Sequence, residues 1–378
     1  MKDFFNHSFD ELQSFCKEIG VAPTHAKTLM KYAYKYLSST SWNYIGAHTQ
    51  SIDDLICENH LTLPQKLKLE MERSFKLEML QIDRDDISHY DKSVKFTFKL
   101  SDGNKINSIL MPETSRLTLC ISSQVGCRYG CSFCSSAKMG FIRDLSAGEI
   151  LAQIVTANDW IKNHPNWPHL FSQSSHNKNF THKHITNIVF MGMGEPLDNL
   201  DAIIKALDIM TCQFGLNLSL RHISVSTVGH LDGLKRLLLE KPDVRIALSV
   251  NAAHDKKRSE LMPINKKYPI ESLVEQIAVR TSQQKHSILI QYLLIDGIND
   301  SEQDAEMLLQ LVKNLKVKVN LIPFNPPFVE QLTTDFKSPK PETVQKFKDH
   351  LYRGGIRVMT RYSKGQDIGA ACGHLAIF

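Results

Sequence analysis

The chain has 378 residues, of which 42% are hydrophobic and 22% charged, with a formal net charge of +5 and eight cysteines. This length can bury a large core and form two or three domains, and the composition is that of a globular protein rather than of a disulfide framework. The mild positive charge permits a nucleic-acid partner without requiring one.

The N-terminal sequence Met-Lys-Asp-Phe-Phe-Asn matches neither a signal peptide nor a transit peptide. No apolar run approaches the length that spans a membrane. The cysteines are few for a chain of this length, which fits reduced thiols in a reducing compartment. We therefore expect a cytoplasmic monomer that has no membrane partner.

Residues 1–75 are predicted to form a small helical domain. Apolar residues recur at helical spacing over Phe9–Ile19 and Ala26–Leu37, and Leu63–Ser74 is a shorter candidate. Two short helices joined by a turn often bind nucleic acid, and four lysines lie along this pair: Lys17, Lys27, Lys31 and Lys35. The alternative is a plain helical cap on the next domain.

Residues 76–112 are predicted to form a short β extension. Its strands are expected at Leu77–Ile82, Val94–Leu100 and Lys105–Met111. The sequence Ser-Asp-Gly-Asn at 101–104 predicts a hairpin turn between the last two strands, because Asp-Gly tolerates positive φ. A further strand, Leu117–Ile121, leads into the next motif.

Three cysteines follow in the spacing C-x3-C-x2-C: Cys127, Cys131 and Cys134. Three close thiolates can bind three irons of a [4Fe-4S] cluster and leave the fourth iron open for another ligand. This spacing resembles that of the radical S-adenosylmethionine (SAM) superfamily. A zinc site with Cys120 as a fourth ligand is the alternative, although zinc sites more often show two C-x2-C pairs.

Strands and helices alternate through the remainder of the chain. The expected strands are Ile185–Phe190, His222–Ser226, Val244–Val250, Ser287–Ile295, Lys318–Ile322 and Arg357–Arg361. The expected helices are Ser146–Ile161, Leu200–Gln213, Leu231–Leu239, Ile270–Thr281, Ser301–Lys313 and Glu342–Tyr352. Repeated strand–helix units imply parallel strands with right-handed crossovers. The sequence therefore predicts an α/β fold whose core, residues 113–366, is an incomplete (β/α)6 barrel.

The segment 164–184 interrupts this alternation with five histidines, at positions 164, 169, 176, 182 and 184. Their spacing is irregular and no carboxylate lies among them. We interpret the segment as a solvated loop insertion rather than a metal site.

Small polar groups follow several strands, at the end where barrels bind ligands. Gly194 and Glu195 follow one strand, and Glu195 could accept hydrogen bonds from a ligand ammonium group. The other candidates are Ser226, Thr227-Val228-Gly229, Ser249, Val250, Asn251 and Asn325.

Five longer motifs resemble the RlmN family of radical SAM RNA methyltransferases. They are Ser-Ser-Gln-Val-Gly-Cys at 122–127, Met-Gly-Met-Gly-Glu-Pro-Leu at 191–197, Met-Pro-Ile-Asn-Lys-Lys-Tyr at 262–268, Asn-Leu-Ile-Pro at 320–323 and Asp-Ile-Gly-Ala-Ala-Cys-Gly at 367–373. The related Cfr enzymes share much of this pattern, but Cys-Ser-Ser-Ala at 134–137 is closer to RlmN.

The resemblance implies a role for each matching residue. The three cysteines of the triad would bind the [4Fe-4S] cluster, and Cys372, on a C-terminal loop at 367–378, would carry a methyl group as S-methylcysteine. Cys120 would resolve the RNA adduct by forming a transient disulfide with Cys372. The expected SAM contacts are Gly194, Glu195, Ser226, Ser249, Val250, Asn251 and Asn325.

The sequence departs from the family pattern at three positions. Asn107 stands where the family has a glutamate that acts as proton acceptor, and an amide cannot serve as a base. Glu113 is a candidate substitute. Asn251 replaces a histidine, and Gln291 stands where a glutamate is common.

The resemblance implies methylation of adenine C2 in 23S rRNA (adenine 2503) and tRNA (adenine 37), with two SAM per turnover and a donor such as flavodoxin. Adenine C2 is electron-poor and does not attack a SAM methyl group, whereas a thiolate does, which explains the carrier cysteine. One alternative is a related enzyme with another RNA target or with C8 specificity. Another is an RNA-binding protein without activity.

Overall fold

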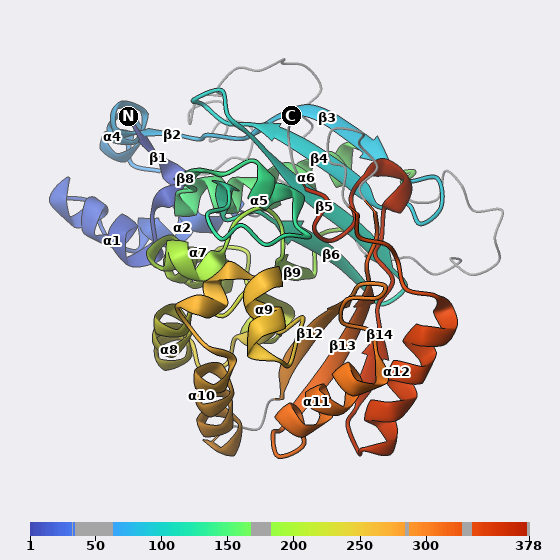
Figure 1. The fold of residues 1–378 in the computed structure, drawn as a ribbon. Coiled ribbons are helices and arrows are strands. Elements are labelled where there is room, and N and C mark those ends of the chain that lie inside the picture. Colours follow the sequence, from blue (N-terminus) through green and yellow to red (C-terminus); the bar gives the residue numbers. More distant parts are fainter. Residues whose placement is uncertain (32, 35–62, 168–182, 284–286, 327–334, 376–378) are drawn as a thin grey trace.

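The computed structural model describes residues 1–31, 33–34, 63–167, 183–283, 287–326 and 335–375. Ten strands of these residues form one sheet, in the order β14-β13-β12-β11-β10-β9-β6-β5-β4-β3 (Figure 1). Neighbours from β6 to β14 are parallel, and β3 to β6 pair antiparallel. The α/β class expected from the sequence is confirmed.

The strands of this sheet are short, and from β6 onward they alternate with helices along the chain. They are β3 (Gln81–Ile87), β4 (Val94–Lys99), β5 (Lys105–Glu113), β6 (Arg116–Ile121), β9 (Asn187–Phe190), β10 (Ile223–Thr227), β11 (Arg245–Ser249), β12 (Ile288–Leu294), β13 (Val317–Pro323) and β14 (Val358–Thr360). The helices that connect the parallel strands are α6 (Ala147–Asn163), α7 (Leu200–Thr211), α8 (Leu231–Glu240), α10 (Ile270–Gln283), α11 (Glu302–Val312) and α12 (Pro341–Arg353).

Helix α6 begins where the sequence predicts. Ser146 Oγ accepts a hydrogen bond from the Glu149 amide at 3.1 Å, and Glu149 accepts one from the Ser146 amide at 2.9 Å. These two bonds satisfy amides that have no partner within the helix. Twelve residues of α6 are buried, because the helix packs against β6, against helix α7 and against the N-terminal residues Phe4–Asn6.

The sheet curls so that its distant strands approach each other. Arg361, directly after β14, contacts the sulfur of Met191 at 3.8 Å and that of Met111 in β5 at 3.9 Å. Six strands separate β14 from β5 in the sheet order (β13, β12, β11, β10, β9 and β6). The contact therefore crosses the inside of the curled sheet.

The N-terminal residues pack onto this core. β1 (Lys2–Asp3) pairs with β2 (Phe75–Lys76), and η1 (Phe4–Asn6), α1 (Phe9–Glu18), α2 (His25–Lys31) and α4 (Gln65–Ser74) complete the segment. Phe4, Phe5 and Leu12 belong to the same buried cluster as the residues of the sheet. The hydrophobic core is thus continuous across residue 75, and a domain boundary there stays a prediction, as do the other boundaries.

The structure differs from the sequence prediction in several described elements. The strand expected at Leu77–Ile82 lies further along as β3, a charged edge strand whose sequence shows no apolar alternation. Other elements were not predicted, among them the strand pair β1–β2, the strand pair β7 (Gln124–Gly126)–β8 (Phe141–Asp144), and helices α5 (Ser135–Lys138) and α9 (Asp255–Leu261).

Two expectations fall on residues that are not described. The helix expected at Ala26–Leu37 is described only up to residue 34, without residue 32, and Lys35 lies outside. The histidines at 169, 176 and 182 also lie outside the described residues. No helix in the described ranges combines the length and apolarity needed to cross a bilayer.

Candidate active site

The three cysteines of the triad lie in the loop after β6, between β7 and α5. The amide of Cys127 donates to the carbonyl of Gly140 at 3.0 Å, and the amide of Cys134 donates to that of Cys131 at 3.1 Å. Gly126 has φ +74°, and a Cβ atom there would lie 1.7 Å from the Gly140 oxygen. A glycine is therefore required for the turn that starts the cysteine loop.

The thiols of this loop form one electrostatic group. Burial raises the pKa of Cys127 to about 12, and burial followed by the charges of Cys134 and Cys127 raises the pKa of Cys131. Thiolates in such a place need a cation to stabilise them. Thiolates are the ligands that iron–sulfur clusters use, so the donor set fits the cluster that the spacing predicts.

A zinc site gains no support from the geometry. In the part of the chain that the structure describes, no three Cys, His, Asp or Glu side chains are grouped closely enough to hold one metal ion, and this holds for Cys127, Cys131 and Cys134 as well. The position of the fourth ligand is therefore what counts against zinc. Cys120, the proposed fourth ligand, lies on β6, and its charged neighbours are Cys372 and Arg361.

Arg258 is a residue of this site that the sequence analysis missed. It is fully buried and donates to the carbonyl oxygens of Val228 at 2.7 Å and Ser249 at 3.2 Å. It therefore connects the ends of β10 and β11. Burial lowers the pKa of Arg258 to about 10, which the charge of Cys131 opposes. The one signal in the sequence that could have indicated Arg258 is its closeness to the Met-Pro-Ile-Asn motif at 262–265. Asn265 of this motif accepts a hydrogen bond from Arg258 at 2.6 Å.

The loop after β9 packs against the start of the cysteine loop. Gly194 has φ +97°, and a Cβ atom there would lie 2.6 Å from that of Gln124. Gln124 accepts a hydrogen bond from the Glu195 amide at 2.8 Å. The glycine thus allows the two loops to touch, as expected for a ligand-binding turn.

Glu195 is a buried carboxylate at this loop. Its oxygens accept hydrogen bonds from the amides of Val228 at 2.9 Å and Leu197 at 3.1 Å. Burial nevertheless raises the pKa of Glu195 to about 7. The residue can therefore change its charge near neutral pH.

One cavity of about 160 Å³ at the strand ends gathers most of the predicted site. Its walls include Cys134, Gly194, Glu195, Ser226, Ser249, Asn251 and Cys372. Gln291 accepts hydrogen bonds from Ser226 Oγ at 3.1 Å and Ser249 Oγ at 3.5 Å across the cavity floor. The predicted carrier cysteine, one predicted cluster cysteine and five of the seven predicted SAM contacts therefore share one space.

Three predicted SAM contacts have other tasks in the structure. Val250 is buried behind the cavity wall, and its carbonyl accepts from Arg258 at 3.2 Å. Asn251 lines the cavity, but its Oδ1 accepts from the Leu293 amide at 2.9 Å. Asn325 is not among the described cavity-lining residues. Its backbone carbonyl instead bonds His374 Nε2 at 2.6 Å.

Cys120 lies on the wall of the sheet near Cys372. It pairs with Ile109 of β5 and Val189 of β9. Burial, followed by the charge of Cys372, raises the pKa of Cys120 to about 12, and the charge of Arg361 opposes this shift. Cys372 therefore lies close enough for its charge to act on Cys120.

The two candidate bases lie in different environments. Asn107 is buried on the face of β5 that Cys120 shares, and its Oδ1 accepts from Thr97 Oγ1 at 2.9 Å. Glu113 forms an exposed ion pair with Arg116 at 2.7 Å, at the far end of β6 from the cysteine loop. The structure therefore does not bring Glu113 to the site, and its role as a substitute base stays a prediction.

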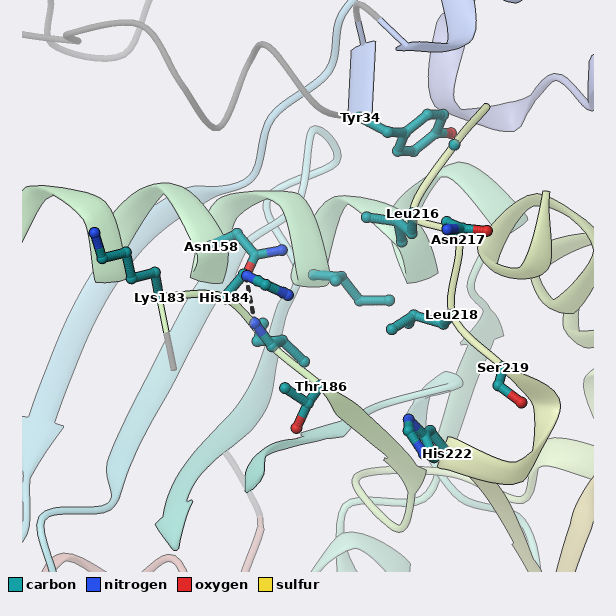
Figure 2. A pocket seen from close by; sticks show the side chains of 13 residues that line it. Tyr34, Asn158, Lys183, His184, Thr186, Leu216, Asn217, Leu218, Ser219 and His222 are labelled. Carbon is teal, nitrogen blue, oxygen red and sulfur yellow. Dashed lines mark hydrogen bonds between the residues drawn. The ribbon is translucent and has the colours of Figure 1, made fainter. Parts of the chain in front are cut away.

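A larger cavity, of about 710 Å³, lies at the opposite ends of the strands. Figure 2 shows Asn158 and His184 on one side of it and Leu218, Ser219 and His222 on the other. Thr186 and His222 directly precede β9 and β10. Barrels place their chemistry at the other strand ends, and none of the predicted site residues lines this cavity.

Comparisons with known proteins agree with this geometry. A family model described as the radical SAM superfamily matches residues 178–310. A dual-specificity RNA methyltransferase RlmN of Nautilia profundicola is 37% identical, over 92% of this chain and 94% of its own length. RlmN of Campylobacter jejuni is 40% identical, over 83% and 86%. The crystal structure of a radical SAM methyltransferase from Sphaerobacter thermophilus has a TM-score of 0.84 at 32% identity, and the match covers 99% of both chains.

The matched regions extend over nearly the whole chain, and they include the N-terminal helices and the C-terminal loop. The chain belongs to the RlmN family of radical SAM RNA methyltransferases.

Proposed function

We propose that this enzyme methylates C2 of adenine in RNA, with 23S rRNA adenine 2503 as its main target and tRNA adenine 37 as a second one. The observation that carries the proposal is the single cavity shared by Cys372, Cys134 and Glu195. The parallel strands act as an incomplete barrel whose open end receives the adenine. An enzyme of C8 specificity remains the competing function, because it would use the same cavity.

Each residue of the site has a task in this proposal. Cys127, Cys131 and Cys134 would bind the [4Fe-4S] cluster, which supplies the electron for reductive cleavage of SAM. The Cys372 thiolate takes a methyl group from one SAM, because sulfur is nucleophilic where adenine C2 is not. The radical that SAM cleavage supplies would first remove a hydrogen atom from that methyl group, so that its carbon can bond to C2, and the adduct then gives up one electron and the C2 proton. The Cys120 thiolate attacks the sulfur of Cys372, so a disulfide forms as the C–S bond breaks and the released carbon takes up a proton.

Glu195, Ser226 and Ser249 would orient SAM in this cavity. The Glu195 carboxylate suits the SAM ammonium group, and the two hydroxyls are fixed by Gln291. The N-terminal helices are proposed to dock the RNA through exposed lysines such as Lys17 and Lys27. External thiols would reduce the disulfide after each turnover, and flavodoxin or a similar protein would supply electrons to the monomeric enzyme.

Mass spectrometry of RNA nucleosides from a deletion strain tests this function. We expect 2-methyladenosine to disappear from digested 23S rRNA and tRNA, and to return with the wild-type gene but not with Cys372→Ala. Loss of 8-methyladenosine instead would show C8 specificity. Unchanged methylation of both RNAs would contradict the proposal.

A further inference from the structure

The segment that carries Cys372 leaves β14 and docks on the turn between β3 and β4 (Figure 1). Asp367, in η8 (Gln366–Ile368), accepts two hydrogen bonds there. Ser88 Oγ donates to one carboxylate oxygen at 2.7 Å, and the amide of His89 donates to the other at 2.9 Å. Hydrogen bonds to a carboxylate are among the stronger ones in proteins.

Two more bonds join the same partners. The amide of Gly365 donates to the Asp91 carboxylate at 2.8 Å, and Lys95 Nζ donates to the carbonyl of Gly369 at 3.3 Å. Gly365 and Gly369 both have φ +61°, which favours glycine. The segment thus turns sharply on either side of Asp367, and it meets the β3–β4 turn at the first bend and strand β4 at the second.

The turn itself is built to present these donors. Ser88 is fully buried, and its Oγ accepts from the amides of Tyr90 and Asp91, each at 3.2 Å. Those bonds fix the hydroxyl, which leaves its hydrogen to donate to Asp367. The bonds that shape the β3–β4 turn therefore do not involve the C-terminal segment.

The topology gives this contact its importance. β14 is one edge strand of the ten-stranded sheet, and β3 is the other. The C-terminal segment leaves the first edge and bonds to the turn at the second. It therefore spans the open side of the curled sheet.

A second anchor lies just beyond Cys372. The amide of Ser135 donates to the carbonyl of Gly373 at 2.7 Å, and Ser136 Oγ donates to the carbonyl of Leu375. Both serines belong to α5, directly after Cys134. Cys372 thus lies between an anchor on the β extension and an anchor on the cysteine loop.

We propose that the β3–β4 turn is a positioning platform, through Ser88 and Asp91, that fixes the register of the Cys372 segment by binding Asp367 and Gly365. The platform keeps the Cys372 sulfur in the cavity of Glu195, where it is to receive the methyl group, and near Cys120. The docking of the segment does not depend on which reaction the enzyme performs. Its effect on methyl transfer to Cys372 rests on the proposed function.

The test compares Asp367→Ala with the wild-type chain by amide hydrogen exchange and by mass spectrometry of Cys372. Asp83→Ala is the matched control, because Asp83 is a carboxylate on β3, close to the β3–β4 turn in the chain, that pairs with Lys105 at 2.7 Å. We expect exchange in residues 363–375 to rise at least about tenfold in Asp367→Ala, since both bonds to a charged acceptor are lost. The same variant should methylate Cys372 about tenfold more slowly, with an unchanged affinity for SAM.

Ser88→Ala is a milder second variant, which removes one of the two bonds and keeps Asp367. It should give a smaller increase in exchange over the same residues, and it decides the question if Asp367→Ala fails to fold.

Unchanged exchange in the variant that folds, or an equal increase in Asp83→Ala, would overturn the platform. Faster exchange in residues 363–375 together with a wild-type rate of Cys372 methylation would overturn the positioning role of the platform. Absence of Cys372 methylation in the wild-type enzyme would instead count against the proposed function, while the exchange result would still decide the docking.

Discussion

The guanidinium of Arg128 lies 2.8 Å from the carboxylate of Asp198, which joins the cysteine loop to the segment after β9. The next residue of the loop, Tyr129, donates its hydroxyl to the other oxygen of Asp198. The carboxylate side chain of Asp198 is only 9% exposed. Two consecutive residues between Cys127 and Cys131 are therefore held by one acid of the cofactor-binding half of the site.

Asp198→Asn should loosen the cysteine loop. The substitution removes the charge that Arg128 and Tyr129 share, which should cost about 1–2 kcal/mol when the half-exposed Arg128 is discounted for solvent screening. We expect iron release to a chelator to become about tenfold faster under anaerobic conditions. Asp201→Asn is the control, since Asp201 is exposed and pairs only with Arg236 among its described contacts. Equal iron release from both variants would show that the ion pair does not hold the loop.

The two thiols should fail in different ways. Cys372→Ala lacks the carrier sulfur and should bind RNA without forming a covalent complex. Cys120→Ala keeps the carrier and should accumulate an RNA–protein thioether, because no neighbouring thiolate can attack it. The adduct is measured as a nuclease-sensitive band on a denaturing gel. Adding Cys131→Ala to the Cys120 variant should erase the band, and its persistence would contradict the roles assigned here.

SAM affinity should depend on pH through Glu195. The pKa of Glu195 is raised to about 7, so the carboxyl is mostly neutral at pH 6 and mostly ionised at pH 8. The SAM ammonium group prefers the ionised form, and affinity should therefore rise with pH and level off above about pH 8. Anaerobic calorimetric titration measures this. Glu195→Gln should bind SAM more weakly at pH 8 and show a flat profile, and an unaltered slope in that variant would assign the titration to another group.

Asn107→Glu should supply the base that the family has at this position. Asn107 is 1% exposed and shares a sheet face with Cys120, so a carboxylate there would be buried and its pKa raised toward neutrality. We expect turnover to increase by roughly 10²-fold, the usual effect of general-base catalysis. Asn107→Gln is the size-matched control. Similar rates in the two variants would mean that another group already takes the proton.

The local parts of this fold were predictable from the sequence. The capping box of Ser146 and Glu149 marks the start of α6, and the Asp-Gly turn at 102–103 joins β4 to β5. Both signals arise from neighbouring residues, which a linear pattern records. β3 escaped prediction because it is an exposed edge strand, whose charged side chains need no apolar alternation.

The site was predictable only where it forms motifs. The three cysteines, Gly194, Glu195 and Cys372 stand in short strings with recognisable spacing. Arg258 stands in no such string, and Asp367, although it begins the string that contains Cys372, has its bonding partners elsewhere in the fold. Ser88 lies 279 residues from Asp367. Such contacts depend on the sheet order, and no periodicity in the sequence reports them.

We expect Arg258 to connect cluster binding at the site to the half-life of the protein in the cell. Its described hydrogen-bond partners are three backbone carbonyls and the amide of Asn265, and no carboxylate in the described ranges lies within ion-pair distance. Asp255 and Glu271 act on this charge only from beyond ion-pair distance, and a buried charge without a contacting counter-ion costs folding free energy. An anionic cluster on the neighbouring cysteines would offset that cost, so newly made chains that lack it should unfold more often and be degraded sooner. The intracellular half-life of the enzyme should therefore follow the supply of iron.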